Sequence, residues 1–467
     1  MELSANRFAA NAREALADGE LQRALGGATQ RLSLARHDAF ADFPEGEALR
    51  TRAREIKRRT LDRLDGYLEE LATSVEARGG TVHWASDAAE AREIVLGLAR
   101  ERGARVAVKS KSMTTEEIAL NEALAAAGIE PVETDLGEYI LQIAEESPSH
   151  IIAPAIHKTK DQISDLFAEK HGTARRERHE EITREARGVL RRRFLEADLG
   201  ITGVNFAVAE TGSIAIVENE GNARLSTSLP RCHIAVMGME KVIPDLDSLA
   251  VFLRILARSA TGQKMSSYVS LITGPRREGE EDGPAELHLV ILDNGRSAIL
   301  ADPVLRESLY CIRCGACLNV CPVYKHAGGH AYGWVYPGPI GAVVTPSLVG
   351  HARAAPLPFA SSLCGACREV CPVRIDLPHL LLAQREKVLA LTRAKPGERA
   401  LVSAFALAMR FPALYRMASR LARWLSIPFA REGQLRRAPL LSAWTRTRDL
   451  PAPARETFRQ RWRRSRG

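Results

Sequence analysis

The sequence predicts an α/β domain with a largely parallel sheet, preceded by a helical lead-in and followed by a mainly helical, cysteine-rich domain and a helical extension. Short apolar runs alternate with helical segments between residues 79 and 300. Seven of the eight cysteines lie in one block, from Cys311 to Cys371. At 467 residues the chain is too long for one ordinary core. We expect four domains, with boundaries at 1–78, 79–300, 301–385 and 386–467.

Residues 1–78 are predicted to be helical, because Leu and Ile recur at helical spacing in EALRTRAREIKRRTLDRLDGYLEELATSV. The first twenty residues include acids and lack the apolar core of a secretory signal. The best apolar run, residues 400–409, is too short to span a bilayer. We therefore expect a cytoplasmic protein.

Residues 79–300 are predicted to form the α/β domain. The runs TVHWA, ARVAVKS, SHIIAPA, FAVAE, SIAIV, HIAVMG and LHLVILD have the composition of strands, and segments such as DAAEAREIVLGLARE have that of helices. Open α/β sheets bind ligands at the ends of their strands, so the polar turns that follow these runs are candidate sites.

Lys109 and Lys111 lie in such a turn, before a predicted helix with Thr114 and Glu117 at capping-box spacing. The amides and dipole of a helix N-terminus favour anions, so the two lysines are candidates for binding an anionic cofactor or substrate. The alternative is that they are ordinary surface lysines.

Glu210 and Glu218 follow two further predicted strands, in AETGS and ENEGNARL. A carboxylate at this position can act as an acid, a base or a nucleophile. Turn capping or plain surface exposure is the alternative for each residue, so both are weak candidates for catalysis.

The strongest pattern is CIRCGACLNVCP, in which Cys311, Cys314, Cys317 and Cys321 precede a proline. This is the C-x2-C-x2-C-x3-C-P run of bacterial two-cluster ferredoxins, in which the fourth cysteine ligates the other cluster. A chain without an export signal favours metal ligation over disulfides. The sequence therefore predicts iron–sulfur clusters, and a mainly helical ferredoxin-like domain over residues 301–385.

The second run, SSLCGACREVCP, supplies only three cysteines. In the crossed arrangement, cluster one takes Cys311, Cys314, Cys317 and Cys371, and cluster two takes Cys321, Cys364 and Cys367. Ser361 stands where a complete run would have its first cysteine. The residues leave open whether cluster two is a [4Fe-4S] or a [3Fe-4S] cluster. Its last ligand could be Ser361, another residue, water or a partner's group.

Two other interpretations of the cysteines remain open. Zinc also uses paired C-x2-C elements, although a structural zinc site takes four ligands per ion and rarely shows this spacing. The clusters could also be purely structural. The segment between the two runs carries His330, Tyr332, Trp334 and Tyr336, which could shield a cluster from water or simply pack.

Residues 386–467 are predicted to be a helical, basic extension. Between residues 431 and 467, eleven arginines and three acids account for the whole net charge of +8. The rest of the chain is close to neutral, so we expect no specific nucleic-acid binding. Docking to an acidic partner or peripheral contact with a membrane remains possible for the tail.

Five segments resemble the LutB-type lactate-utilisation iron–sulfur proteins over nearly the entire chain. They are KSKSMTTEEIALNEAL, VETDLGEYILQIAEESPSHIIAPAIHK, AETGSIAIVENEGNARLSTSLP, GGHAYGWVYPGPIGAV and LCGACREVCPVRIDLP. The resemblance implies an electron-transfer component, inactive alone, of an oxidoreductase complex that converts L-lactate to pyruvate. It also implies two [4Fe-4S] clusters, and two partner proteins, one rich in cysteine and one a lone lactate-utilisation domain.

The α/β domain also resembles the fold of coenzyme A transferases and sugar-phosphate isomerases. Resemblance of fold alone says little about function. It nevertheless keeps open an alternative, in which the chain is an acyl or CoA-type transferase and its clusters only brace the fold. A cluster-containing nucleic-acid protein acting through the basic tail is a third possibility.

Overall fold

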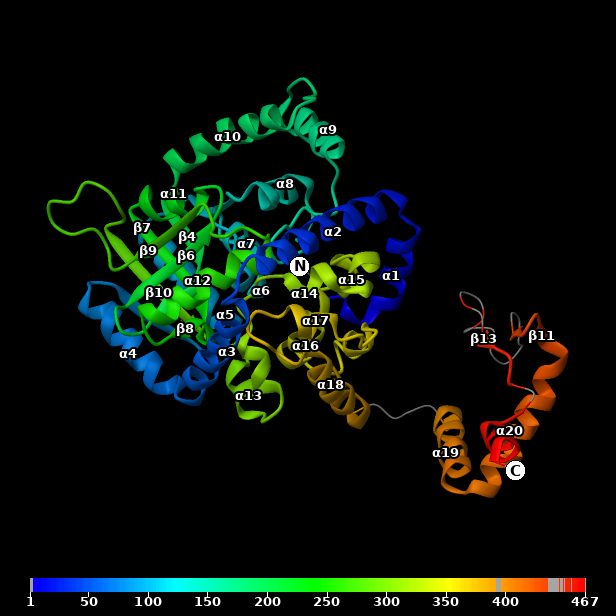
Figure 1. Ribbon diagram of the computed structural model, residues 1–467. Coiled ribbons are helices and arrows are strands. Elements are labelled where there is room, and N and C mark those ends of the chain that lie inside the picture. Colours follow the sequence, from blue (N-terminus) through cyan, green and yellow to red (C-terminus); the bar gives the residue numbers. More distant parts are fainter. Residues whose placement is uncertain are drawn as a thin grey trace. The chain divides into compact units, whose positions relative to one another are not determined.

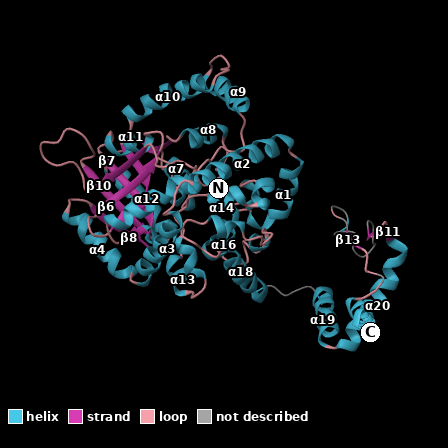
Figure 2. Cartoon of the chain, in the orientation of Figure 1, coloured by secondary structure: helices cyan, strands magenta, loops and turns pink. Residues whose placement is uncertain are grey.

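The computed structural model describes residues 3–391, 396–435, 445, 448, 450–454 and 456–466. The chain forms two compact units, Met1–Leu391 and Thr392–Gly467. The first unit contains the helical lead-in, the α/β part and the cysteine-rich part (Figure 1). Figure 2 shows that most of its strands gather in the α/β part, while the cysteine-rich part consists of helices and loops.

Six parallel strands form the main sheet, in the order β1-β10-β7-β4-β2-β3. The strands are β1 (Thr81–Ala85), β2 (Val106–Lys109), β3 (Glu130–Glu133), β4 (Leu199–Gly203), β7 (Cys232–Gly238) and β10 (Glu286–Leu292). Every residue of β7 is buried, as expected for a central strand covered on both faces. Because all six strands are parallel, their carboxyl ends lie at one edge of the sheet.

Helices connect and cover these strands, and side chains fix where several of them begin. The Asp87 carboxylate accepts hydrogen bonds from the N–H groups of Ala89 and Glu90 at the start of α5. The helices are α5 (Ala88–Glu101), α6 (Met113–Glu117), α7 (Leu120–Ala126), α8 (Leu136–Ala144), α9 (Lys160–His171), α10 (His179–Glu196), α11 (Asn222–Ser228) and α12 (Leu246–Ala260).

A second sheet packs beside the first, in the order β8-β5-β6-β9. Its strands are β5 (Phe206–Val208), β6 (Ser213–Glu218), β8 (Val242–Ile243) and β9 (Tyr268–Ile272). The β5–β6 and β6–β9 pairs are antiparallel, and the β5–β8 pair is parallel. The fold class predicted from the sequence, an α/β domain with a largely parallel sheet and helical parts before and after it, is confirmed.

One predicted strand is wrong. Residues 149–155, SHIIAPA, form bends and turns. The ring nitrogen Nδ1 of His150 accepts hydrogen bonds from the N–H groups of Ile152 (3.1 Å) and Ala153 (3.2 Å), which closes a tight turn. Pro154 follows and cannot donate to a strand ladder. Instead of joining the sheet, this segment contributes Ile151 to the core around the cysteines.

The cysteine-rich part consists of short helices separated by loops. Its helices are α13 (Arg296–Ala301), α14 (Ala316–Val320), α15 (Pro322–Ala327), α16 (Gly338–Val349), α17 (Ala366–Val370) and α18 (Leu377–Leu391). Three 3-10 helices lie between them, at Leu305–Tyr310, His330–Tyr332 and Leu357–Phe359.

The lead-in helices are α1 (Phe8–Ala17), α2 (Gly19–Ala41), α3 (Gly46–Asp62) and α4 (Leu64–Ala77). In Figure 1, α1 and α2 lie against α14 and α15, which are far away in the sequence. Two arginines, one in α2 and one in α3, connect the lead-in to the end of α17. Arg36 donates to the carbonyl of Val370 at 2.9 Å, and the buried Arg50 donates twice to the carbonyl of Cys371, at 3.2 and 2.9 Å. The lead-in therefore holds the second cysteine run.

A buried ion-pair network joins the α/β part to the cysteine-rich part. The guanidinium of Arg296 forms two hydrogen bonds of 2.8 Å with the Glu117 carboxylate and one of 2.7 Å with Glu240. The Tyr336 hydroxyl donates to Glu117 at 2.6 Å. All four side chains are buried. Such a network is costly to break, because each group left without its partner stays in a low dielectric.

The second unit contains α19 (Pro396–Arg410), α20 (Pro412–Ser426) and α22 (Phe458–Arg466), with the short strands β11 (Ala430–Arg431), β12 (Gln434–Leu435) and β13 (Leu450–Pro451). None of the residues of α19, α20 and α22 is buried. Part of the predicted basic tail, including residues 436–444, lies outside the described residues. Within the described chain, no helix has both the length and the apolar character needed to cross a bilayer.

Candidate functional site

Four cysteines from the two runs line one cavity of about 20 Å³, which we call the four-cysteine cavity. They are Cys311, Cys314, Cys317 and Cys371, the set that the crossed arrangement assigns to cluster one. Burial, followed by the neighbouring Cys371, raises the pKa of the Cys314 thiol to about 12. Positive charge between the four sulfur atoms would stabilise their thiolate forms, and the iron ions of a cluster would supply it.

The remaining three cysteines form a second group. Burial, followed by the electrostatic effect of Cys321 and Cys364, raises the pKa of the Cys367 thiol to about 12. The sulfur atoms of Cys321 and Cys364 are therefore close to that of Cys367. Cys364 is exposed, whereas Cys321 and Cys367 are buried. Cys317 interacts electrostatically with Cys367, which shows that the two groups are adjacent. The second group therefore lies nearer to solvent than the four-cysteine cavity.

The two cysteine runs have the same backbone shape. Arg313 and Leu363, at equivalent positions, both have positive φ values, 60° and 54°. Two residues later, Gly315 and Gly365 also have positive φ, 73° and 88°. Non-glycine residues rarely adopt this conformation, so its recurrence indicates that the two runs form the same type of ligand-binding loop.

Ser361 takes the place of a cysteine in the repeated loop. In the first run, the N–H of Arg313 donates to Cys311 Sγ at 3.4 Å. In the second run, the N–H of Leu363 donates to Ser361 Oγ at 3.1 Å. The serine oxygen thus has the same local hydrogen bond as the cysteine sulfur that lines the four-cysteine cavity.

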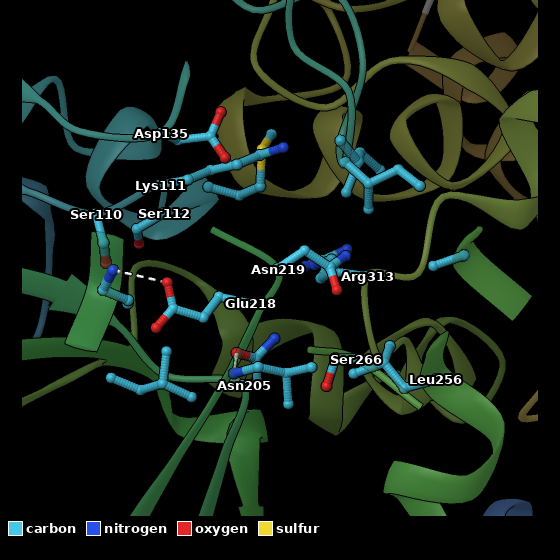
Figure 3. Close-up of a pocket in the computed structure, with 18 of the residues that line it drawn as sticks. Ser110, Lys111, Ser112, Asp135, Asn205, Glu218, Asn219, Leu256, Ser266 and Arg313 are labelled. Atoms are coloured by element: carbon cyan, nitrogen blue, oxygen red, sulfur yellow. Dashed lines mark hydrogen bonds between the residues drawn. The ribbon is translucent and has the colours of Figure 1, made fainter. Parts of the chain in front are cut away.

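A larger cavity, of about 280 Å³, opens at the carboxyl edge of the main sheet, and we call it the carboxyl-edge cavity. Ser110, Lys111 and Ser112 follow β2, Asp135 follows β3, and Asn205 follows β4 (Figure 3). This edge is where open α/β sheets bind ligands. The second sheet and α12 form further walls, and the cysteine-rich part closes the cavity with two residues, Arg313 and Tyr336.

Three cations line this cavity. Lys111 and Arg313 reach into it from different parts of the unit (Figure 3), and Lys241 lies on its wall with an exposed fraction of 9%. Burial, opposed by Glu240, lowers the pKa of Lys241 to about 8. Nη1 of Arg313 is buried and has no hydrogen-bond acceptor among the described residues.

The carboxylates of the cavity, in contrast, already accept backbone hydrogen bonds. Glu218 accepts from the N–H groups of Ala223 and Arg224, both at 2.8 Å, and its carboxylate turns toward that backbone in Figure 3. Asp135 caps α8 in the same way. Burial, then Asp135, raises the pKa of Glu220 to about 7, so this carboxyl is partly protonated at neutral pH.

The structure separates the residues that the sequence singled out. Lys111 and Glu218 line the carboxyl-edge cavity. Lys109 does not, because its ammonium is buried and lies 2.7 Å from both Glu116 and Glu133. Glu210 is exposed in a turn outside the cavity. The helix after Lys111 is capped by Ser112, whose hydroxyl accepts the N–H of Thr115, so the predicted cap at Thr114 is wrong.

Sequence reasoning missed Lys241 and Arg313. Lys241 follows β7, and a search of every strand end for cations would have found it. Arg313 stands between two cysteines, where the cluster motif draws attention to the sulfur ligands and not to the residues between them. Tyr336 was considered as a shield for a cluster or as a packing residue, whereas it also lines the carboxyl-edge cavity.

Comparison with known families divides the chain into three matched regions. The LUD domain matches residues 68–292, the 4Fe-4S dicluster domain matches residues 307–375, and the domain described as "Lactate utilisation protein B, C-terminal" matches residues 385–466. The dicluster match covers both cysteine runs. It supports iron–sulfur clusters in preference to zinc.

Curated relatives match nearly the full length. A lactate utilization protein B from Shouchella clausii is 48% identical over 98% of this chain and 97% of the relative. The protein of the same name from Bacillus subtilis is 48% identical over 95% of this chain and 93% of the relative. A solved structure of a DUF162 family protein from Deinococcus radiodurans is 16% identical over 44% of this chain and 98% of that chain. Its TM-score is 0.17.

Proposed function

The chain belongs to the lactate utilization protein B family, and on that premise we propose that it transfers electrons in a multi-protein system that oxidises L-lactate to pyruvate. The coarser description, a lactate-utilisation iron–sulfur protein, follows from the family and its 4Fe-4S dicluster domain. The chain acts with two partners, one rich in cysteine and one a lone lactate-utilisation domain, and has no activity alone.

The observation that carries the proposal is the enclosed set of four cysteines beside a second, more exposed group. In the first site, Cys311, Cys314, Cys317 and Cys371 are the ligands. Two four-iron clusters, each able to take up one electron, match the two electrons that leave L-lactate with two protons when pyruvate forms. A buried site next to an exposed one is an arrangement suited to passing electrons between the interior and a partner at the surface.

The protein matrix around the ligands also fits this role. The N–H groups of Arg313 and Ile375 donate to the sulfur atoms of Cys311 and Cys371, at 3.4 and 3.3 Å. Hydrogen bonds to sulfur and exclusion of solvent are the means by which a protein sets a cluster's reduction potential. The exposed Cys364 puts the second site where a partner protein can approach it.

The proposal is tested with the full chain purified without oxygen. Iron and acid-labile sulfide are counted, and electron paramagnetic resonance (EPR) spectra are recorded before and after L-lactate is added together with the two partner proteins. We expect both clusters to be reduced only when L-lactate and the partners are present. Zinc in place of iron, or clusters that stay oxidised under these conditions, would overturn the proposal.

We further propose that Ser361 Oγ is the fourth protein ligand of cluster two, with Cys321, Cys364 and Cys367. The repeated loop supports this, because Ser361 accepts the same backbone hydrogen bond as Cys311. A serine oxygen is a harder ligand than a thiolate, and it holds iron less readily.

Replacing Ser361 with Ala is expected to release one iron from cluster two, because the iron loses its only non-cysteine ligand from this chain. Oxidised Ser361→Ala protein should show the EPR signal of a three-iron cluster, whereas Ser361→Cys should keep four irons with a changed reduction potential. Ser362→Ala is the matched control, since the Ser362 side chain hydrogen-bonds the ligand Cys364 without holding iron in this assignment, so this variant should keep four irons. A four-iron cluster in Ser361→Ala with the wild-type potential would contradict the assignment.

A further inference from the structure

The carboxyl-edge cavity has the features of a binding site for a small anion. It lies at the edge of the parallel sheet where ligands bind, and its volume of about 280 Å³ is near the lower end of the range for small-molecule sites. Polar side chains from several segments converge on it, including Ser112, Asn205 and Asn219. A cavity of this size suits a compound of a few carbon atoms.

The charges on its walls favour a negatively charged ligand. Lys111, Lys241 and Arg313 all line the cavity. Nη1 of Arg313 has no acceptor among the described residues, and the side chain of Arg313 is only 10% exposed. A buried cation without a hydrogen-bond partner is costly unless something compensates it. The nearest charge to the Arg313 guanidinium is Glu240, at 3.7 Å, which is too long for a hydrogen bond.

Glu240 offsets part of the positive charge of Lys241 and Arg313 electrostatically, and the carboxylates on the cavity walls accept backbone hydrogen bonds. Glu218 and Asp135 are occupied by backbone N–H groups at the starts of α11 and α8. Glu220 accepts the N–H of Leu136 at 3.0 Å. The cations therefore remain available to an anion from outside the chain, and a guanidinium with a nearby ammonium suits a carboxylate group.

The cavity also adjoins the four-cysteine cavity. Ile151 and Arg313 line both cavities, so only single residues lie between the two spaces at these positions. The ring of Tyr336 stacks under the guanidinium, with Cζ of Arg313 4.5 Å from the ring centroid, and holds the arginine between the two spaces. A ligand bound to Arg313 is therefore next to the ligands of cluster one.

From these observations we infer that the carboxyl-edge cavity binds a small organic monocarboxylate, whose carboxylate group contacts Lys241 and Arg313 beside the first cluster site. The monocarboxylate is a 2-hydroxy or 2-oxo acid whose oxygen on carbon 2 faces Asn205 or Asn219. This choice of acid rests on the proposed function. The cavity thereby gives this chain its own contact with the acid, in addition to any contact made by a partner.

Binding is measured by isothermal titration calorimetry on the full-length, cluster-loaded chain without its partners. The probes are L-lactate, pyruvate, and lactamide, which has nearly the same shape as lactate but no charge. We expect L-lactate or pyruvate to bind and to change the EPR spectrum of reduced cluster one, while lactamide does neither. Equal binding of lactamide, or no binding of either acid to cluster-loaded protein, would overturn the inference.

Two variants test the residues. Lys241→Met is expected to weaken binding by about tenfold or more, the usual effect of losing a charged hydrogen bond. Lys111→Met serves as a second variant, because Lys111 is less buried and its loss is better tolerated in folding. Iron content and the melting temperature show whether each variant is folded and loaded. Wild-type affinity in folded, cluster-loaded Lys241→Met protein would contradict the contact with Lys241, and wild-type affinity in both variants would overturn the inference.

Lys57→Met is the matched control. Lys57 is buried like Lys241 and interacts electrostatically with the same Glu240 and Cys311, but it does not line the cavity. It should therefore alter the cluster's electrostatic surroundings without weakening the binding of the acid. The two proposals fail in different ways. If L-lactate and the partners cannot reduce the clusters, the electron-transfer role is overturned. If the clusters are intact but the acid does not bind, only the proposed binding site is overturned.

Discussion

Replacing Cys314 with Ala is expected to remove about half of the iron and acid-labile sulfide and to abolish L-lactate-dependent electron transfer in the reconstituted system. Cys314 is buried in the four-cysteine cavity, and none of the described residues beside it offers a substitute sulfur ligand once it is lost. Iron and sulfide counts give the first result, and EPR after L-lactate is added gives the second.

The control for this experiment is Cys232→Ala, since Cys232 is a buried cysteine of β7 that lies outside both cysteine groups. Its iron content and electron transfer should match those of the wild type. The same pair of variants separates the competing functions. If Cys314→Ala loses a cluster but keeps the activity of the folded protein, the clusters only brace the fold, and the transferase alternative gains support.

Replacing Arg296 with Met is expected to produce the largest loss of stability, about 3–5 kcal/mol. The reason is the pair of carboxylates that it leaves behind. Burial alone would raise the pKa of Glu240, but Arg296 and Arg313 lower it to about 2, so this carboxylate is ionised at neutral pH. Glu117 is likewise buried, and Arg296 lowers its pKa against the effect of burial. Without Arg296, two negative charges remain in the interior.

The melting temperature, measured by circular dichroism at a fixed scan rate, checks this expectation. Arg254→Met is the control, because Arg254 pairs with Glu45 at the surface, where an ion pair contributes at most about 1 kcal/mol. Adding Glu117→Gln and Glu240→Gln to Arg296→Met should recover part of the loss, since the buried charges are then gone. Similar melting temperatures for Arg296→Met and Arg254→Met would contradict the account.

The parts of the fold that follow a regular pattern were predictable from the sequence. Runs such as HIAVMG and LHLVILD lie in β7 and β10, two central strands whose apolar residues are buried on both faces. SHIIAPA is similarly apolar but forms a turn, because His150 accepts hydrogen bonds from two backbone N–H groups. A side chain that binds its own backbone competes with the sheet, and composition does not reveal the outcome.

The candidate site was predictable only in part, and for a similar reason. The spacing of the cysteines follows directly from cluster chemistry, so the candidate cluster ligands could be predicted from the motif without a structure. Residues two apart on one strand share a face, but Lys109 is the last residue of β2 and lies in a buried ion pair, whereas Lys111 stands in the turn after the strand and lines the cavity. Arg313 and Lys241 meet only through tertiary contacts, which no local pattern encodes.

The contacts of Arg36 and Arg50 with the second cysteine run have a consequence for how the protein is made. Arg50 and Cys371 are 321 residues apart, so the ribosome completes the lead-in helices long before the loop they hold exists. Pairing of such distant segments is slow, because much of the chain must be ordered first. Iron loading is therefore among the last events of biogenesis, and a chain shortened at its N-terminus would lose metal although no ligand had been removed.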